Sequence, residues 1–129
     1  MLRKERILYL FLIWLCLALY FFNNLLLKQI SAGFLRYFAV SHFNDFLAPV
    51  IMLSISNLAL SFTGRSIIKL WQVLLFTLAC GAFWEFTAFL FPDGVLILPA
   101  STYDPLDFIA YFAGGILFWI IVKTVKSTE

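Results

Sequence analysis

Four long apolar runs, which together occupy most of the chain, constrain its fold more than any other feature of the sequence. They cover residues 7–27, 45–62, 70–91 and 106–122. A helix needs about 20 mostly apolar residues to cross roughly 30 Å of hydrocarbon. Each run is continuous rather than alternating in polarity, which indicates helices, because a helix satisfies its own backbone hydrogen bonds in lipid. We therefore predict an all-α integral membrane protein, a small bundle of four transmembrane helices that forms a single domain over residues 1–129.

The composition agrees with a membrane environment. Of the 129 residues, 64% are hydrophobic and 12% are charged, whereas soluble domains have about 45–50% apolar and about 25% charged residues. A soluble domain of this size could not bury that much apolar surface. The net charge of only +2 provides no basic surface for nucleic acid, so we expect no nucleic-acid partner.

Recognised catalytic motifs are absent from the sequence. It contains no phosphate loop, no GxSxG or HExxH motif and no dinucleotide fingerprint. Cys16 and Cys80 each stand within an apolar run, without the spacing of a metal or redox motif. The sequence therefore predicts no cofactor and favours a non-enzymatic protein over an enzyme.

The distribution of basic residues predicts the orientation in the membrane. Positive residues near helix ends favour the cytoplasmic side. Seven of them fall on one side of a four-helix arrangement, namely Arg3, Lys4, Arg6, Arg65, Lys69, Lys123 and Lys126. The other side carries only Lys28 and Arg36. We therefore predict a multi-pass protein of the cytoplasmic membrane with both termini inside, so that residues 28–44 and 92–105 face outward.

The segment 28–44 also contains apolar residues, of which Phe34 and Tyr37 are examples. This pattern is typical of a piece that lies in the membrane interface. The sequence leaves open whether the segment is interfacial or re-entrant.

Polar residues that could bind a ligand gather in the outer half of the predicted bundle. They are His42, Asp45, Glu85, Tyr103, Asp104 and Asp107. Glu85 lies six residues before the end of its run, which places it about 9 Å below the helix end. A carboxylate at that depth is costly and usually faces a bundle interior, a partner or a water-filled cavity. The alternative is a protonated Glu85 that joins two helices by a hydrogen bond.

Most of the other candidates have a purely structural alternative. Asp104, with Pro105 behind it, fits the start of a helix as its N-cap, and Asp107 suits the positive end of that helix. Asn44 and Asp45 can be interpreted in the same way, as a polar cap before Pro49.

A metal site is the functional alternative for some of these residues. His42 is the only histidine, and a lone histidine is more often an interfacial residue than a metal ligand. His42, Asp45 and Glu85 could together bind a metal only if three helices converge.

Small and polar residues mark the faces where helices are expected to meet. Thr77, Gly81 and Glu85 share one face of the third run, and Gly114 and Gly115 lie in the fourth. In the second run, residues at helical spacing predict interhelical hydrogen bonds. These residues are Ser54, Asn57 and Ser61.

Two stretches that contain acidic residues stand late in the sequence, Trp-Glu-Phe-Thr at 84–87 and Asp-Pro-Leu-Asp-Phe-Ile-Ala-Tyr-Phe-Ala-Gly at 104–114. They resemble the VanZ-like family of small bacterial membrane proteins. The resemblance covers roughly residues 70–122. It implies that Glu85 and Asp107 are the family's paired acidic positions, and that the protein belongs to a group linked in named members to glycopeptide resistance. This chain departs from the family pattern at Ala88 and Tyr111, where Gln and Asn are common.

Three functional hypotheses follow. The first is a protein with an outward-facing acidic pocket, with Glu85 and Asp107 as its floor and Asp45 and Tyr103 nearby, that binds a lipid head group, a lipid-linked envelope precursor, a small molecule or a cation. The second is a small transporter for a cation or a proton-coupled solute such as citrate, which would require a homo-oligomer. The third is a membrane enzyme that uses paired carboxylates as acid and base.

Overall fold

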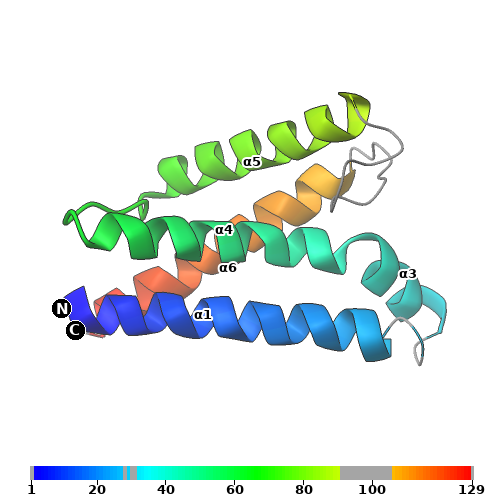
Figure 1. Ribbon diagram of the computed structural model, residues 1–129, viewed down its shortest axis with the longest axis horizontal. Coiled ribbons are helices and arrows are strands. Elements are labelled where there is room, and N and C mark those ends of the chain that lie inside the picture. The colour runs from blue at the N-terminus through cyan, green and yellow to red at the C-terminus, as the bar shows by residue number, and fades with distance from the viewer. Residues whose placement is uncertain (1, 28, 30–31, 91–105, 129) are drawn as a thin grey trace.

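The computed structural model describes residues 2–27, 29, 32–90 and 106–128, and every element within them is helical (Figure 1). In chain order they are α1 (Leu2–Phe22), the π-helix η1 (Asn23–Leu27), α3 (Gly33–Ser41), α4 (Phe43–Ser61), α5 (Leu70–Leu90) and α6 (Leu106–Ser127). Four helices are long and apolar enough to cross a membrane, namely α1 with η1, α4, α5 and α6. The prediction of an all-α chain with four helices of membrane-spanning length is therefore confirmed for the described residues, and the length and composition of these helices are typical of a multi-pass membrane protein.

The helix boundaries differ most from the prediction at the two chain ends. α1 begins at Leu2 rather than at residue 7, and α6 continues to Ser127 rather than ending at 122. Hydropathy places a boundary at the first charged residues, but the helical backbone continues through them because long basic side chains extend toward water from a helical position. The apolar runs therefore predicted the positions of the spans but underestimated the lengths of α1 and α6.

The helices surround a core in which α4 is central. α4 packs against both α1 and α6, whereas α5 packs mainly against α6 (Figure 1). Tyr9, Leu53 and Phe118, from α1, α4 and α6, are buried at the centre of this core. Because α5 packs against α6 rather than against α4, the consecutive helices α4 and α5 have few contacts with each other.

Glycines allow the close approach of α6 to its neighbours. A Cβ atom at Gly114 would collide with the backbone oxygen of Phe46 in α4. A Cβ atom at Gly115 would lie 2.5 Å from the hydroxyl oxygen of Thr77 in α5, and one at Gly81 would lie 2.8 Å from the Tyr111 ring. The prediction that small residues mark the helix contacts is confirmed.

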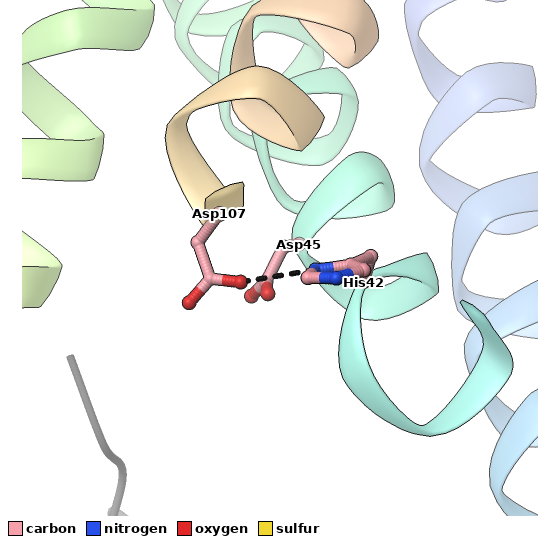
Figure 2. Close-up of side chains that lie close together, drawn as sticks. All are labelled: His42, Asp45 and Asp107. Carbon is pink, nitrogen blue, oxygen red and sulfur yellow. Dashed lines mark hydrogen bonds and ion pairs between the residues drawn. The ribbon is translucent and has the colours of Figure 1, made fainter. Parts of the chain in front are cut away.

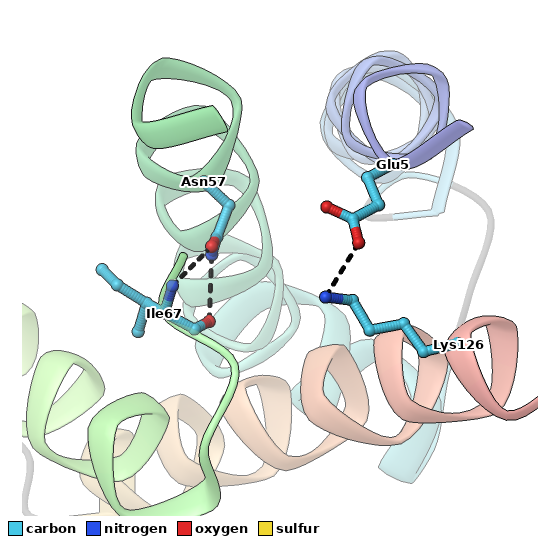
Figure 3. Close-up of polar contacts among 4 residues, drawn as sticks. All are labelled: Glu5, Asn57, Ile67 and Lys126. Carbon is cyan, nitrogen blue, oxygen red and sulfur yellow. Dashed lines mark hydrogen bonds and ion pairs between the residues drawn. The ribbon is translucent and has the colours of Figure 1, made fainter. Parts of the chain in front are cut away.

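Both chain ends lie at one end of the bundle, called here the terminal end, together with the α4–α5 connection (Figure 1). At this end Lys126 Nζ lies 2.9 Å from Glu5 Oε1, which joins α6 to α1 (Figure 3). Arg6 of α1 donates a hydrogen bond of 3.0 Å to the Ser61 hydroxyl of α4. The opposite end, called the α3 end, carries α3 and the start of α6 (Figure 1).

The polar residues of α4 bond differently from the prediction. Of Ser54, Asn57 and Ser61, only Ser61 makes a hydrogen bond to another helix within the described residues. The Ser54 hydroxyl donates to the carbonyl of Val50 in its own helix. Asn57 accepts a hydrogen bond from the Ile67 amide at 2.7 Å and donates to the Ile67 carbonyl at 3.1 Å (Figure 3). The prediction was wrong for Ser54, because a serine inside a helix can satisfy its donor on the preceding turn. It was also wrong for Asn57, whose partners lie in its own helix and in the α4–α5 connection.

The segment predicted to be interfacial contains the short helix α3. Phe34, Leu35 and Tyr37 are exposed on it, and the Tyr37 ring packs edge-on against His42, with 5.6 Å between the ring centroids. Its position relative to a membrane stays a prediction. Within the fold, α3 leads the chain from η1 into α4.

Candidate functional site

Three side chains with metal-binding atoms converge at the α3 end of the bundle. His42 and Asp45 come from the start of α4, and Asp107 comes from the start of α6 (Figure 2). One potential ligand atom from each of the three lies within 4.8 Å of the others. His42 Nδ1 and Asp107 Oδ1 are 3.2 Å apart, and both side chains are largely buried, at 11% and 13% exposed. We call these three residues the His–Asp cluster.

The starts of two helices hold the cluster in place. His42 is the N-cap residue of α4 but makes no side-chain capping bond, so its ring is available to Asp107. Asp45 and Asp107 each lie in the first turn of a helix, where the positive end of the helix dipole favours a carboxylate. The interpretation of Asn44 and Asp45 as the cap of α4 was wrong, because the helix begins at Phe43.

Glu85 and Tyr111 lie beside the cluster. Asp45 interacts electrostatically with both Glu85 and Asp107, and its carboxyl group faces the Tyr111 hydroxyl. Glu85 is 8% exposed and Tyr111 is 5% exposed. Carboxyl groups from α4, α5 and α6 therefore lie near one another, but the potential ligand set contains Asp107 in place of the predicted Glu85.

The side-chain amides of Asn23 and Asn24, which bond to Asn44 next to the cluster, were not identified from the sequence. Asn23 Nδ2 donates to Asn44 Oδ1 at 3.1 Å, and Asn44 Nδ2 donates to Asn24 Oδ1 at 3.3 Å. Asn23 and Asn24 stand in η1, and π-helical turns often occur at functional sites. The signal in the sequence was the pair of asparagines at the end of an otherwise apolar run.

The charge of the cluster has no lysine or arginine partner within the part of the chain that the structure describes. There Asp107 pairs with His42, and neither Asp45 nor Asp107 forms an ion pair with lysine or arginine. Carboxylates that share a site repel one another, and a proton or a cation relieves this repulsion. The cluster is therefore suited to bind a cation.

A cavity of about 730 Å³ extends from the cluster between α4 and α5. Asn44, Asp45 and Tyr111 line its polar end, and its walls are otherwise mainly apolar, with Met52 and Phe76 farthest from the cluster. The expected pocket differs from this cavity, because Glu85 and Asp107 do not line it. Tyr103 and Asp104, which were also expected at the site, lie outside the described residues.

No family model, curated protein or solved structure matches this chain. The assignment of a function therefore depends on the geometry and chemistry of the site itself.

Proposed function

We propose that this chain is a membrane protein that binds a divalent cation through the His–Asp cluster. The observation that supports this proposal is the convergence of His42, Asp45 and Asp107, whose potential ligand atoms lie within 4.8 Å of one another. A zinc ion holds nitrogen and oxygen ligands about 2.0–2.2 Å from itself, so that two ligands of one ion lie roughly 3–4 Å apart. The 3.2 Å separation of His42 Nδ1 and Asp107 Oδ1 fits this requirement.

The ligand types favour particular metals. Imidazole suits zinc and other transition metals, whereas carboxylates also suit Mn²⁺, Mg²⁺ and Ca²⁺. A set of one imidazole and two carboxylates therefore fits Zn²⁺ or Mn²⁺ better than Mg²⁺ or Ca²⁺. Three protein ligands leave at least one coordination position open for a further ligand.

Tyr111 adds a further polar group to the cluster. Its hydroxyl group is buried and faces the Asp45 carboxyl group. In this position the hydroxyl group could hydrogen-bond both to Asp45 and to a further ligand on the ion.

The proposal places the cluster on the outer side of a bacterial cytoplasmic membrane, in line with the basic residues and the resemblance to the VanZ-like family. A transporter is less well supported, because the Asn57–Ile67 and Glu5–Lys126 contacts join the helices at the terminal end. An enzyme would use the open position on the metal to activate water. Turnover of a substrate by the metal-loaded protein would favour this alternative.

The test is metal binding to the detergent-purified protein. We expect isothermal titration with Zn²⁺ and Mn²⁺ to show one site per chain, and the variants Asp45→Asn, Asp107→Asn and His42→Gln to bind at least tenfold more weakly. Glu5→Gln removes a carboxylate at the terminal end and serves as the control, with unchanged binding. Equal affinity in the wild type and all three cluster variants would disprove the proposal.

A further inference from the structure

The cavity between α4 and α5 gives the His–Asp cluster an apolar extension. Asp45 belongs to both, since it contributes to the potential ligand set and lines the cavity. The volume of about 730 Å³ falls within the range of roughly 300–1,000 Å³ found for ligand pockets. A ligand that fills both parts must have a polar group at one end and an apolar chain at the other.

We propose that this cavity and the metal-loaded cluster together bind one phospholipid, with its phosphate on the metal and an acyl chain between α4 and α5. This inference rests on the proposed function, because it requires the ion. A divalent cation balances the charges of Asp45 and Asp107, and its open coordination position can accept a phosphate oxygen of a phospholipid. Without the ion, the carboxylates would repel that phosphate.

The dimensions of the cavity fit a lipid from one leaflet. Its lining on α4 runs from Asn44 to Met52, which corresponds to about 12 Å of helix at a rise of 1.5 Å per residue. Half of a bilayer's hydrocarbon is roughly 15 Å thick. The cavity is therefore long enough to hold an acyl chain through most of one leaflet, and too short to form a path across the membrane.

The polarity of the lining residues decreases along the cavity, as the polarity of a phospholipid decreases from its head group to its acyl chains. The side chains of Asn44 and Tyr111 make the end of the cavity next to the cluster polar, and the phosphate and the ester groups would lie there. Ala48 and Ala79 are small, exposed residues of the middle section, on facing helices. Phe76 contributes an apolar surface farther along. The polar end joins the cation site directly, which favours a phospholipid over a second copy of this chain.

The experiment uses native mass spectrometry of the full chain in detergent, with dipalmitoyl phosphatidylglycerol as the probe. We expect one bound phospholipid in the presence of Zn²⁺ or Mn²⁺ and at least tenfold less in EDTA. Dipalmitoylglycerol, which has the same acyl chains but no phosphate, should bind at least tenfold more weakly. Equal binding of the two lipids, or phospholipid binding that survives EDTA, would overturn the inference.

Replacement of matched alanines by phenylalanine distinguishes binding in the cavity from binding at the metal site. Ala48→Phe and Ala79→Phe fill the cavity and should reduce phospholipid binding at least tenfold, while the metal affinity stays within twofold of the wild type. Ala59→Phe and Ala82→Phe add the same side chain at exposed positions of the same helices outside the cavity lining, and should change neither. If Ala48→Phe and Ala79→Phe bind the phospholipid normally, this inference fails and the metal site stands. If the wild type binds no metal, the proposed function fails as well.

Discussion

Asn57 shows how one buried polar residue can organise a membrane helix pair. Its side chain is fully buried and bonds to both the amide and the carbonyl of Ile67. Ile67 belongs to the connection between α4 and α5, where the backbone is not helical. Backbone groups without helical partners must be satisfied elsewhere when they are buried. The Asn57 side chain therefore supplies the donor and the acceptor that a neighbouring β-strand would supply in a sheet.

Replacement of Asn57 should destabilise the fold. In Asn57→Ala the two backbone groups of Ile67 lose their partner, and a buried group left without a hydrogen bond costs about 1–3 kcal/mol. We expect the free energy of unfolding, measured by titration with a denaturing detergent and circular dichroism, to fall by roughly that amount. Ser56→Ala, at the neighbouring position, is the control and should leave the unfolding free energy nearly unchanged. A similar stability for both variants would contradict this account.

The residues of the candidate site differ in how well they could be predicted. Asp45, Glu85 and Asp107 were recognisable, because carboxylates in apolar runs are costly and rare. The partnership of His42 with Asp107 was not, since it depends on the corner between α3 and α4 and on the position of α6. Tyr111 was noted as a departure from the VanZ-like pattern and not as a site residue, because its approach to Asp45 follows from the closeness of α4 and α6 at Gly114.

At the scale of the helices, close packing depends on glycine and sets the shape of the site. Gly114 meets the backbone of α4, whereas Gly115 meets a side chain of α5. A backbone neighbour cannot move without shifting its helix, but the Thr77 hydroxyl that faces Gly115 is a single side-chain atom. The two adjacent glycines should therefore respond differently to the same substitution.

Gly114→Ala should destabilise the bundle more than Gly115→Ala. Overpacking a tight contact costs about 1–3 kcal/mol and occasionally more, and Gly114→Ala should lie at the upper end, with weaker metal binding because Asp45 and Asp107 move apart. Thr77→Ala removes the atom that an added Cβ at residue 115 would meet, so it should restore Gly115→Ala but not Gly114→Ala. Detergent unfolding and zinc titration of the single and double variants measure both effects. Rescue of Gly114→Ala by Thr77→Ala would show that the contacts are assigned wrongly.

The contact between the first and last helices should be measurable as a coupling. Glu5 is 9% exposed and lies 2.9 Å from Lys126, so this pair is more protected than a surface ion pair. Exposed pairs contribute about 0.2–1 kcal/mol, and loss of one partner of a buried pair costs about 3–5 kcal/mol. A double-mutant cycle with Glu5→Gln and Lys126→Gln should give a coupling energy of about 1–3 kcal/mol in the unfolding free energy. Independent effects of the two substitutions would mean that the pair does not join α1 to α6 in solution.

For the whole molecule, the apolar runs were sufficient to predict four spans, because lipid imposes a minimum length on every crossing. The arrangement of the helices was not predictable in the same way. The position of α5 on α6 rather than on α4, which opens the cavity, follows from side-chain contacts such as Gly115 with Thr77. Hydropathy alone does not encode these contacts, since every helix is apolar on most of its surface.

The orientation of the whole molecule can be tested by the accessibility of single cysteines. In a background with Cys16 and Cys80 replaced by alanine, Phe34→Cys places a thiol on the exposed face of α3, and Thr63→Cys places one at the exposed α4–α5 connection. The excess of basic residues at the terminal end predicts that this end is cytoplasmic. A membrane-impermeant maleimide should therefore label Phe34→Cys in intact cells and Thr63→Cys only after the cells are permeabilised. The reverse pattern would place the His–Asp cluster on the cytoplasmic side, where the phospholipid would have to come from the inner leaflet.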